Sequence, residues 1–361
     1  MYCRKLLLEK GIGNEKKNRV FRAINGTNPD KIPRGDLSIE QGLLNDLLIH
    51  ATGIKSEDLD SFKKESIVRN YLQMDLMMVH DYPVKIIDTY PDGSLLHRGW
   101  YGEEFLVKGS STKLIKPAVE DLDPDLLCPE ISADNLANNK IKWFEKNSDM
   151  FIFAHTMGPI SGFQWLQGFE SAMMDALLKT REVLGLTERM IELELTRTKA
   201  YLDLGADAVL IADDIGINTG LLYPPKILDL LAYPFYKTMV EKIKAYKNVP
   251  VFFHSDGNIN EALESIISCG FDGIQSLQPS AGMDIVAISR KYPDICLMGN
   301  LDLNYLMPFG SPEEVRDEVQ NLMNCLTDAR FILSTCNTLT DSIPVENVLA
   351  MYLEKGEVSG I

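Results

Sequence analysis

Continuous apolar runs recur eight times along the chain, and helix-like segments separate most of them. A run without polar residues at every second position is typical of a strand buried on both faces of a parallel sheet. Repeated alternation of strand and helix predicts an α/β fold, the (β/α)8 TIM barrel. The predicted strands span residues 33–39, 74–80, 150–155, 207–214, 249–256, 271–277, 295–300 and 330–336.

Amphipathic patterns between these runs predict the helices. Apolar residues recur at three- and four-residue spacing over 186–204, and residues 227–246 and 260–269 behave similarly. Gly270 is expected to end the last of these. Ser311-Pro312 predicts a helix start, with serine as the cap and proline in the first turn.

One region, about 82–118 in the N-terminal third, breaks this rhythm. Turn signals such as Pro91-Asp92-Gly93-Ser94 separate short apolar runs there and predict a β-hairpin insertion on the barrel. Because barrels of this type commonly exceed about 250 residues as one unit, we expect residues 1–361 to form a single domain.

Composition narrows the class of protein. The chain is 45% hydrophobic and 24% charged, as ordinary globular proteins are, and its net charge of -16 argues against nucleic acid or an anionic membrane as partner. The six cysteines form no CxxC pair, which favours a reducing cytoplasm. No apolar run approaches the roughly 20 residues that span a bilayer.

The carboxyl ends of two predicted strands carry metal-ligand side chains. Barrel active sites lie at this end of the strands. His254 and Asp256 are two residues apart and therefore share a face, and Cys336 ends the last strand. Imidazole, carboxylate and thiolate together predict a catalytic metal site with an open position. The alternatives are a core histidine bonded to backbone and a buried apolar thiol.

Further polar residues at the strand ends supply catalytic and substrate-binding candidates. Asp214 and His155 are the predicted catalytic residues, while Asp213 is assigned a structural role. The Asp213-Asp214 pair could equally be a helix cap or a partner of a histidine. The predicted substrate-binding residues are His80, Asn300 and Asn337.

Several segments together resemble the uroporphyrinogen decarboxylase superfamily and, within it, the cobalamin-dependent methyltransferases. The resemblance is strongest over His254-Ser255-Asp256-Gly257-Asn258-Ile259. It extends to residues 19–33, 158–170, 269–273, 298–302 and 344–348. In the methyltransferase branch a His-x-Cys pair and a distant Cys bind zinc. His254 and Cys336 match the outer two, and Asp256 stands where the middle Cys is expected.

The resemblance implies a Zn2+-dependent enzyme that moves a methyl group between a small substrate and the cobalt of a corrinoid. The substrate class would be a methoxylated aromatic, a methylamine or a thiol. Because the chain has no Asp-x-His-x-x-Gly motif, the corrinoid is expected on a separate partner protein. A carboxylate in place of a thiolate leaves zinc less electron-rich, which favours an oxygen leaving group, as in an O-demethylase. We expect a cytoplasmic monomer or homodimer.

Two other functions stay open. The first is a metal-free decarboxylase acting on a tetrapyrrole. Its substrate carries eight carboxylates, for which that branch uses an Arg-rich loop, whereas residues 36–42 here contain no Arg. Its late Gly-His-Gly motif is replaced by Cys336-Asn337-Thr338. The second is a barrel that binds a ligand without turnover.

Overall fold

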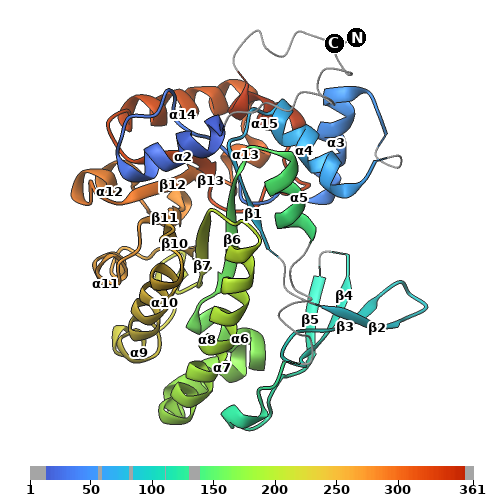
Figure 1. Ribbon diagram of the computed structural model, residues 1–361, viewed down its shortest axis with the longest axis vertical. Helices are drawn as coiled ribbons and strands as arrows, with labels where there is room; N and C mark the ends of the chain where they lie inside the picture. The colour runs from blue at the N-terminus through green and yellow to red at the C-terminus, as the bar shows by residue number, and fades with distance from the viewer. Residues whose placement is uncertain (1–13, 56–58, 81–83, 110, 130–138, 354–361) are drawn as a thin grey trace.

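Seven parallel strands form one curved sheet with the order β1-β6-β7-β10-β11-β12-β13 (Figure 1). The computed structural model describes residues 14–55, 59–80, 84–109, 111–129 and 139–353. Each strand coincides with a predicted apolar run, so the predicted α/β barrel class is confirmed. The bounds are β1 (Leu76–Val79), β6 (Phe151–Met157), β7 (Ala208–Ala212), β10 (Val251–Ser255), β11 (Gly273–Ser276), β12 (Cys296–Leu301) and β13 (Phe331–Thr335).

The eighth predicted strand, residues 33–39, is an irregular extended segment. On one side the Gly35 N–H donates to the Leu333 carbonyl of β13 at 3.0 Å, and on the other the Met78 N–H of β1 donates to the Leu37 carbonyl at 3.0 Å. The segment opens with a proline, which has no N–H to add to a ladder. It therefore links β13 to β1 without forming a regular strand.

Helices follow the strands and pack around the sheet (Figure 1). The predicted helix 227–246 is two helices, because Pro234 in the first turn of the second cannot continue the first. Ser311 caps α14 as predicted, and with Glu314 it forms a capping box. The covering helices are α3 (Gln41–Thr52), α4 (Ser61–Tyr71), α5 (Asn139–Asn147), α8 (Thr180–Asp203), α9 (Pro225–Leu231), α10 (Tyr233–Tyr246), α11 (Leu263–Ser268), α12 (Ile285–Lys291), α14 (Pro312–Cys325) and α15 (Val345–Tyr352).

Shorter elements complete the connections. Helices α6 (Pro159–Gln167) and α7 (Phe169–Leu178) lie between β6 and α8, and α13 (Leu306–Phe309) follows β12. A two-residue pair, β8 (Gly216–Ile217) and β9 (Gly220–Leu221), follows β7. The 3-10 turns are η2 (Pro124–Leu126) and η4 (Pro279–Ala281). In the described parts of the chain, no helix is both long and apolar enough to cross a membrane.

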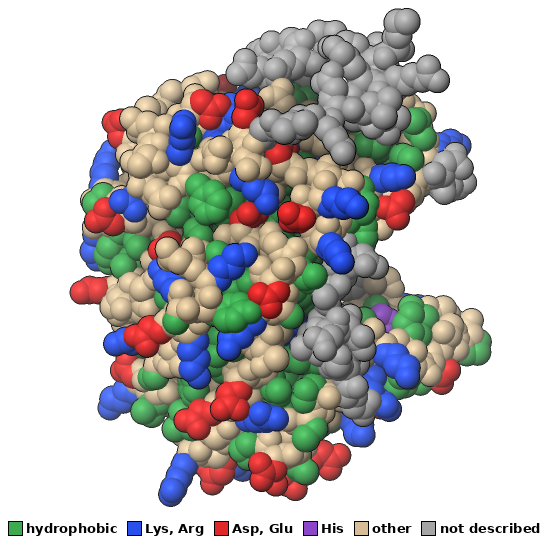
Figure 2. Space-filling view, viewed as in Figure 1, with side chains coloured by type: hydrophobic (Ala, Val, Ile, Leu, Met, Phe, Trp, Pro, Cys, Tyr) green, Lys and Arg blue, Asp and Glu red, His purple; other side chains and the backbone are tan. Residues whose placement is uncertain are grey.

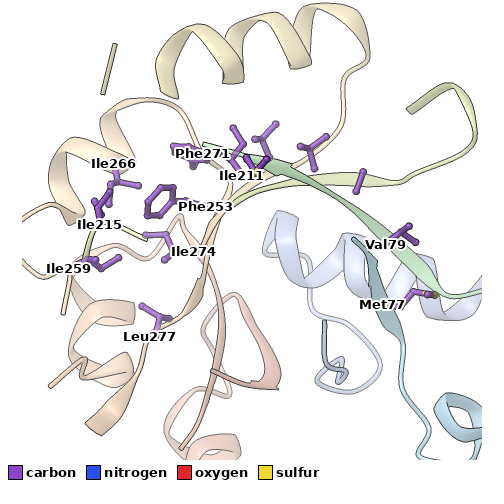
Figure 3. Close-up of a cluster of buried hydrophobic side chains, with 14 of the residues drawn as sticks. Met77, Val79, Ile211, Ile215, Phe253, Ile259, Ile266, Phe271, Ile274 and Leu277 are labelled. Carbon is purple, nitrogen blue, oxygen red and sulfur yellow. The ribbon is translucent and has the colours of Figure 1, made fainter. Parts of the chain in front are cut away.

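Alternating side chains divide the strands into two buried faces. Phe153, Phe252 and Met298 lie in a core shared with Val20 of α2 (Glu15–Asn25), which therefore covers the amino-terminal end of the strands. The intervening residues, such as Phe253 and Ile274, pack outward in the second core (Figure 3). Because this alternation has a period of two, the inward series 153, 252 and 298 continues to residues 155, 254 and 300.

The insertion is a four-stranded antiparallel sheet rather than the predicted hairpin (Figure 1). Its strands are β2 (Lys85–Thr89), β3 (Leu95–Arg98), β4 (Glu104–Lys108) and β5 (Ser111–Lys116). The predicted turn at 91–94 joins β2 to β3, whereas a second and a third turn extend the sheet. Of the predicted range 82–118, residues 82, 83 and 110 lie outside the described residues. Tyr101 anchors the insertion by donating to Glu194 of α8 at 2.6 Å.

Acidic and basic side chains are interspersed over the face shown in Figure 2. The excess of negative charge, -16 in all, is therefore not gathered into one acidic field on this face. A surface with both signs of charge interspersed does not produce the strong field of one sign that attracts a charged polymer such as nucleic acid.

Asp36, a fully buried carboxylate in segment 33–39, ties that segment to β13 and α15. It accepts from the Ser334 hydroxyl at 2.9 Å, from both the N–H and the hydroxyl of Thr335 at 2.9 and 2.6 Å, and from the Tyr352 hydroxyl at 2.6 Å. Burial raises the pKa of Asp36, and these donors oppose that shift.

Replacing Asp36 with Ala should destabilise the protein strongly, because several buried donors lose their acceptor at once. We expect a loss of at least about 3 kcal/mol in the free energy of unfolding, measured by chemical denaturation. The exposed Asp46→Ala variant is the matched control and should change stability by no more than about 0.5 kcal/mol. Equal stability losses in the two variants would contradict this role for Asp36.

Candidate metal centre

Three side chains converge at the carboxyl ends of β7 and β10. The Nε2 atom of His254 is 3.7 Å from Asp214 Oδ1 and 4.0 Å from Asp256 Oδ1. His254 pairs with Ala212 in the β7–β10 register. Asp214 and Asp256 each follow two residues later, so they lie level with each other at the carboxyl ends of the strands. Among the described residues, these three form the one group of His, Cys, Asp or Glu whose ligand atoms lie within 4.8 Å of one another. Two predicted members, His254 and Asp256, are therefore together.

The imidazole of His254 is held in one orientation. Its Nδ1 atom is bonded to the side-chain oxygen of Gln275 on the adjacent strand β11. The amide nitrogen of Gln275 donates to the carbonyls of Thr335 and Cys336 at 3.3 and 3.0 Å, which fixes the amide orientation because carbonyls only accept. Nδ1 must then carry a proton, and Nε2 faces the two carboxylates.

Each carboxylate of the group is positioned by hydrogen bonds. Asp256 accepts from the Ser276 hydroxyl at 2.8 Å and from the Asn337 amide at 2.7 Å. The Asp256 N–H in turn donates to Asp214 Oδ1 at 2.9 Å, and the Asp214 N–H donates to the Ser161 hydroxyl at 2.8 Å. The network brings together strand ends from β7, β10, β11 and β13.

Cys336 lies beside this group but is not a member of it. Its thiol is buried and donates to the Leu301 carbonyl of β12 at 3.3 Å. Burial, together with the charges of Asp302 and Asp256, raises the pKa of Cys336. With Asp256 it lines a pocket of about 90 Å³ whose other walls are Gln278, Leu303, Asn304 and Asn337.

Two further predicted site residues form an imidazole pair. The rings of His80 and His155 meet edge to face with centroids 4.2 Å apart. His155 is 8% exposed, and its Nδ1 is buried without a hydrogen-bond partner among the described residues. Burial, and then the nearby charges of His80, Arg197 and His254, lower the pKa of His155 well below 6.5.

Asn337 and Asn300, the two predicted amide contacts to substrate, both donate hydrogen bonds within the protein. Asn337 donates to Asp256, and its own oxygen accepts from the Thr338 N–H at 2.7 Å, so it positions Asp256. Asn300 is buried at the end of β12 and donates to the Leu277 carbonyl at 3.1 Å.

Asp213 and Asp214, which follow β7, differ in burial. Asp213 is fully buried and accepts from the Ile160 N–H at 3.2 Å and from the Tyr236 hydroxyl. Burial raises the pKa of Asp213 to about 7. It therefore caps α6, which is the structural role assigned to it, while the side chain of Asp214 is 54% exposed at the mouth.

The sequence indicated no role for Ser276 or Ser161, and it offered Gln275 only as a polar residue at a strand end, without a role. The available signal was weak, because it consisted of a single amide side chain inside the apolar run 271–277. A polar side chain in a strand buried on both faces needs a partner, but its identity depends on which strand lies opposite.

The pKa of His155 generates a prediction about stability and pH. Because its folded pKa lies below 6.5, the unfolded chain binds the proton first and stability falls as the pH drops through that region. Between pH 7.5 and 5.5, the wild-type protein should lose about 1.4 kcal/mol more than a His155→Phe variant, measured by denaturation at each pH. His50→Gln, at a half-buried helical position, is the control. Parallel pH profiles for wild type and His155→Phe would refute the assignment.

Parts of the sequence are similar to known proteins. Residues 140–354 match the family described as uroporphyrinogen decarboxylase (URO-D). A uroporphyrinogen decarboxylase of Prochlorococcus marinus strain MIT 9301 is 29% identical over 130 residues, 36% of this chain and 36% of that protein. This match thus spans about a third of that relative's length. A protein of Methanosarcina barkeri, "Methylcobamide:CoM methyltransferase MtaA", is 22% identical over 210 residues, 58% of this chain and 59% of that protein.

A solved structure agrees over almost the whole chain. The methyltransferase from Methanosarcina mazei superposes with a TM-score of 0.70 at 18% identity, covering 93% of this chain and 96% of that one, and so shares its fold. Since the family match covers more than half of the sequence, the chain belongs to the uroporphyrinogen decarboxylase family.

Proposed function

We propose that this chain is a methyltransferase that moves a methyl group between a small methylated molecule and the cobalt of a corrinoid carried by a separate protein. The observation that carries the proposal is the imidazole nitrogen Nε2 of His254, held toward two carboxylates beside a small pocket. The similarity to a methylcobamide methyltransferase of Methanosarcina barkeri supports the same reaction class.

A divalent metal, zinc in the first instance, fits the donor set at the end of β10. His254 and Asp256 would hold it, and Cys336 and Asp214 are the candidates for the third protein ligand. Such an ion supplies a Lewis acid that polarises the bond between the methyl group and its oxygen, nitrogen or sulfur. Gln275 keeps the His254 ring in the metal-binding tautomer, and Ser276 and Asn337 hold the Asp256 carboxylate.

The pocket beside Asp256 has the size for a small methyl-bearing group. At about 90 Å³ it takes only a few heavy atoms, and the amides of Gln278, Asn304 and Asn337 would orient them by hydrogen bonds. His155 and Asp214 as catalytic residues, and His80 and Asn300 as substrate contacts, stay predictions of this proposal.

Decarboxylation of a tetrapyrrole is less well supported by this pocket. A substrate with several carboxylates needs several cations around it. The described residues that line the pocket are one acid, three amides, one leucine and one cysteine, none of them Lys or Arg. We therefore favour methyl transfer over decarboxylation.

Methyl transfer can be measured directly on the purified, metal-loaded chain. A methylated corrinoid protein should lose its methyl group to a thiol, an amine or a phenol, and the absorption spectrum should change as methyl-Co(III) becomes Co(I). His254→Ala should lower the rate by at least about 100-fold, since even the residues that orient a metal ligand are worth 10- to 100-fold. Exposed Glu261→Gln is the control. Failure of every acceptor and donor pair with a metal-loaded protein would refute the proposal.

The tautomer of His254 generates a separate prediction. Gln275→Leu removes the acceptor at Nδ1, so the ring can turn or take the wrong tautomer. We expect a metal affinity lower by about 10- to 100-fold in isothermal titration calorimetry, with the fold intact by circular dichroism. Gln320→Ala, on the exposed face of α14, is the matched control. Unchanged affinity in Gln275→Leu would mean that Gln275 does not fix the imidazole.

A further inference from the structure

The geometry of Asp214, His254 and Asp256 suits one shared cation. Two ligand atoms that are each about 2.1 Å from an ion can be at most about 4.2 Å apart. The distances from His254 Nε2 to the two carboxylate oxygens, 3.7 and 4.0 Å, meet this limit. The two carboxylates are within 4.8 Å of each other, and the exposed side chain of Asp214 has room to close the difference.

The orientation of the His254 ring supports an ion at this position. His254 is only 8% exposed, and its Nε2 faces the carboxylate oxygens of Asp214 and Asp256. Its Nδ1 already carries the proton given to Gln275. A cation between Nε2 and the two carboxylates would contact all three ligand atoms and would offset the repulsion between the two negative charges.

Cys336 points elsewhere. Its thiol donates to the Leu301 carbonyl across the β12–β13 pair, and its sulfur is outside the group of mutually close ligand atoms. It forms a wall of the neighbouring pocket, which Asp256 also lines and Asp214 does not.

We propose that Asp214, rather than Cys336, is the third protein ligand, so that the ion is bound by one imidazole nitrogen and two carboxylate oxygens. The inference rests on the proposed function only in requiring a metal at the end of β10. It assigns the site a donor set without sulfur, unlike the thiolate set that the sequence resemblance implies.

The donor set has a consequence for the ion that the site accepts. Carboxylates are harder ligands than thiolates and suit Mn2+ and Co2+ as well as Zn2+, whereas thiolates select for softer ions. The chain should therefore bind Co2+ and Mn2+ readily, and Asp256→Cys should shift its preference toward Zn2+.

The test uses the full chain stripped of metal and loaded with Co2+, whose absorption reports sulfur ligands through a sulfur-to-cobalt charge-transfer band. Wild type and Cys336→Ser should give the same spectrum without that band and bind Co2+ equally tightly in calorimetry. Asp214→Asn and Asp214→Ser should each bind at least about 100-fold more weakly, more than the loss of an outer residue causes. Glu261→Gln is the acidic control, and Asp256→Cys is the positive control in which the band should appear.

Several results would overturn the inference. Suppose that wild type shows the charge-transfer band and that Cys336→Ser loses both the band and Co2+ binding. This result would assign the third ligand position to the thiol. Folded Asp214 variants that bind Co2+ as tightly as wild type would also overturn it, as would a wild-type protein that binds neither Co2+, Mn2+ nor Zn2+. Methyl transfer is measured independently, so a metal-binding protein without transferase activity would refute the proposed function and leave the ligand assignment standing.

Discussion

The alternation of side chains along parallel strands is the constraint on which the rest of this structure depends. Within each strand, one set of residues fills the interior together with α2 and the other packs against the outer helices. At the carboxyl ends the interior series changes from Phe153, Phe252 and Met298 to His155, His254 and Asn300. Polar side chains therefore gather at the mouth because the apolar series beneath them sets their direction.

Acidic residues in this barrel divide by burial into two kinds. Asp36 and Asp213 are fully buried, and their oxygens accept hydrogen bonds from several donors. Asp36 thereby closes the barrel between segment 33–39 and β13, and Asp213 caps α6. Asp214 and Asp256 are partly exposed and keep oxygens directed toward His254. All four carboxylates accept hydrogen bonds, so what separates the two kinds is burial and whether an oxygen also faces His254.

The candidate centre departs from the thiolate sites that the sequence resemblance implies. With a carboxylate at position 256 and a second at 214, the bound ion would keep more of its positive charge than a thiolate site allows. Such an ion is better suited to polarising an ether or amine than to stabilising a soft sulfur anion. The pocket of amides beside it accepts hydrogen bonds and donates them, which suits small polar substrates.

Seven of the eight strands, the helix start at Ser311 and the cluster of polar residues at the strand ends follow from local patterns, because burial on both faces requires continuous apolar runs. Segment 33–39 and the extra strands of the insertion could not be predicted, since short hydrogen-bonded stretches depend on their neighbours. His254 and Asp256 were placed together by their spacing alone. Whether Asp214 or Cys336 completes their group is a question of register between strands distant in the chain, which only the tertiary structure decides.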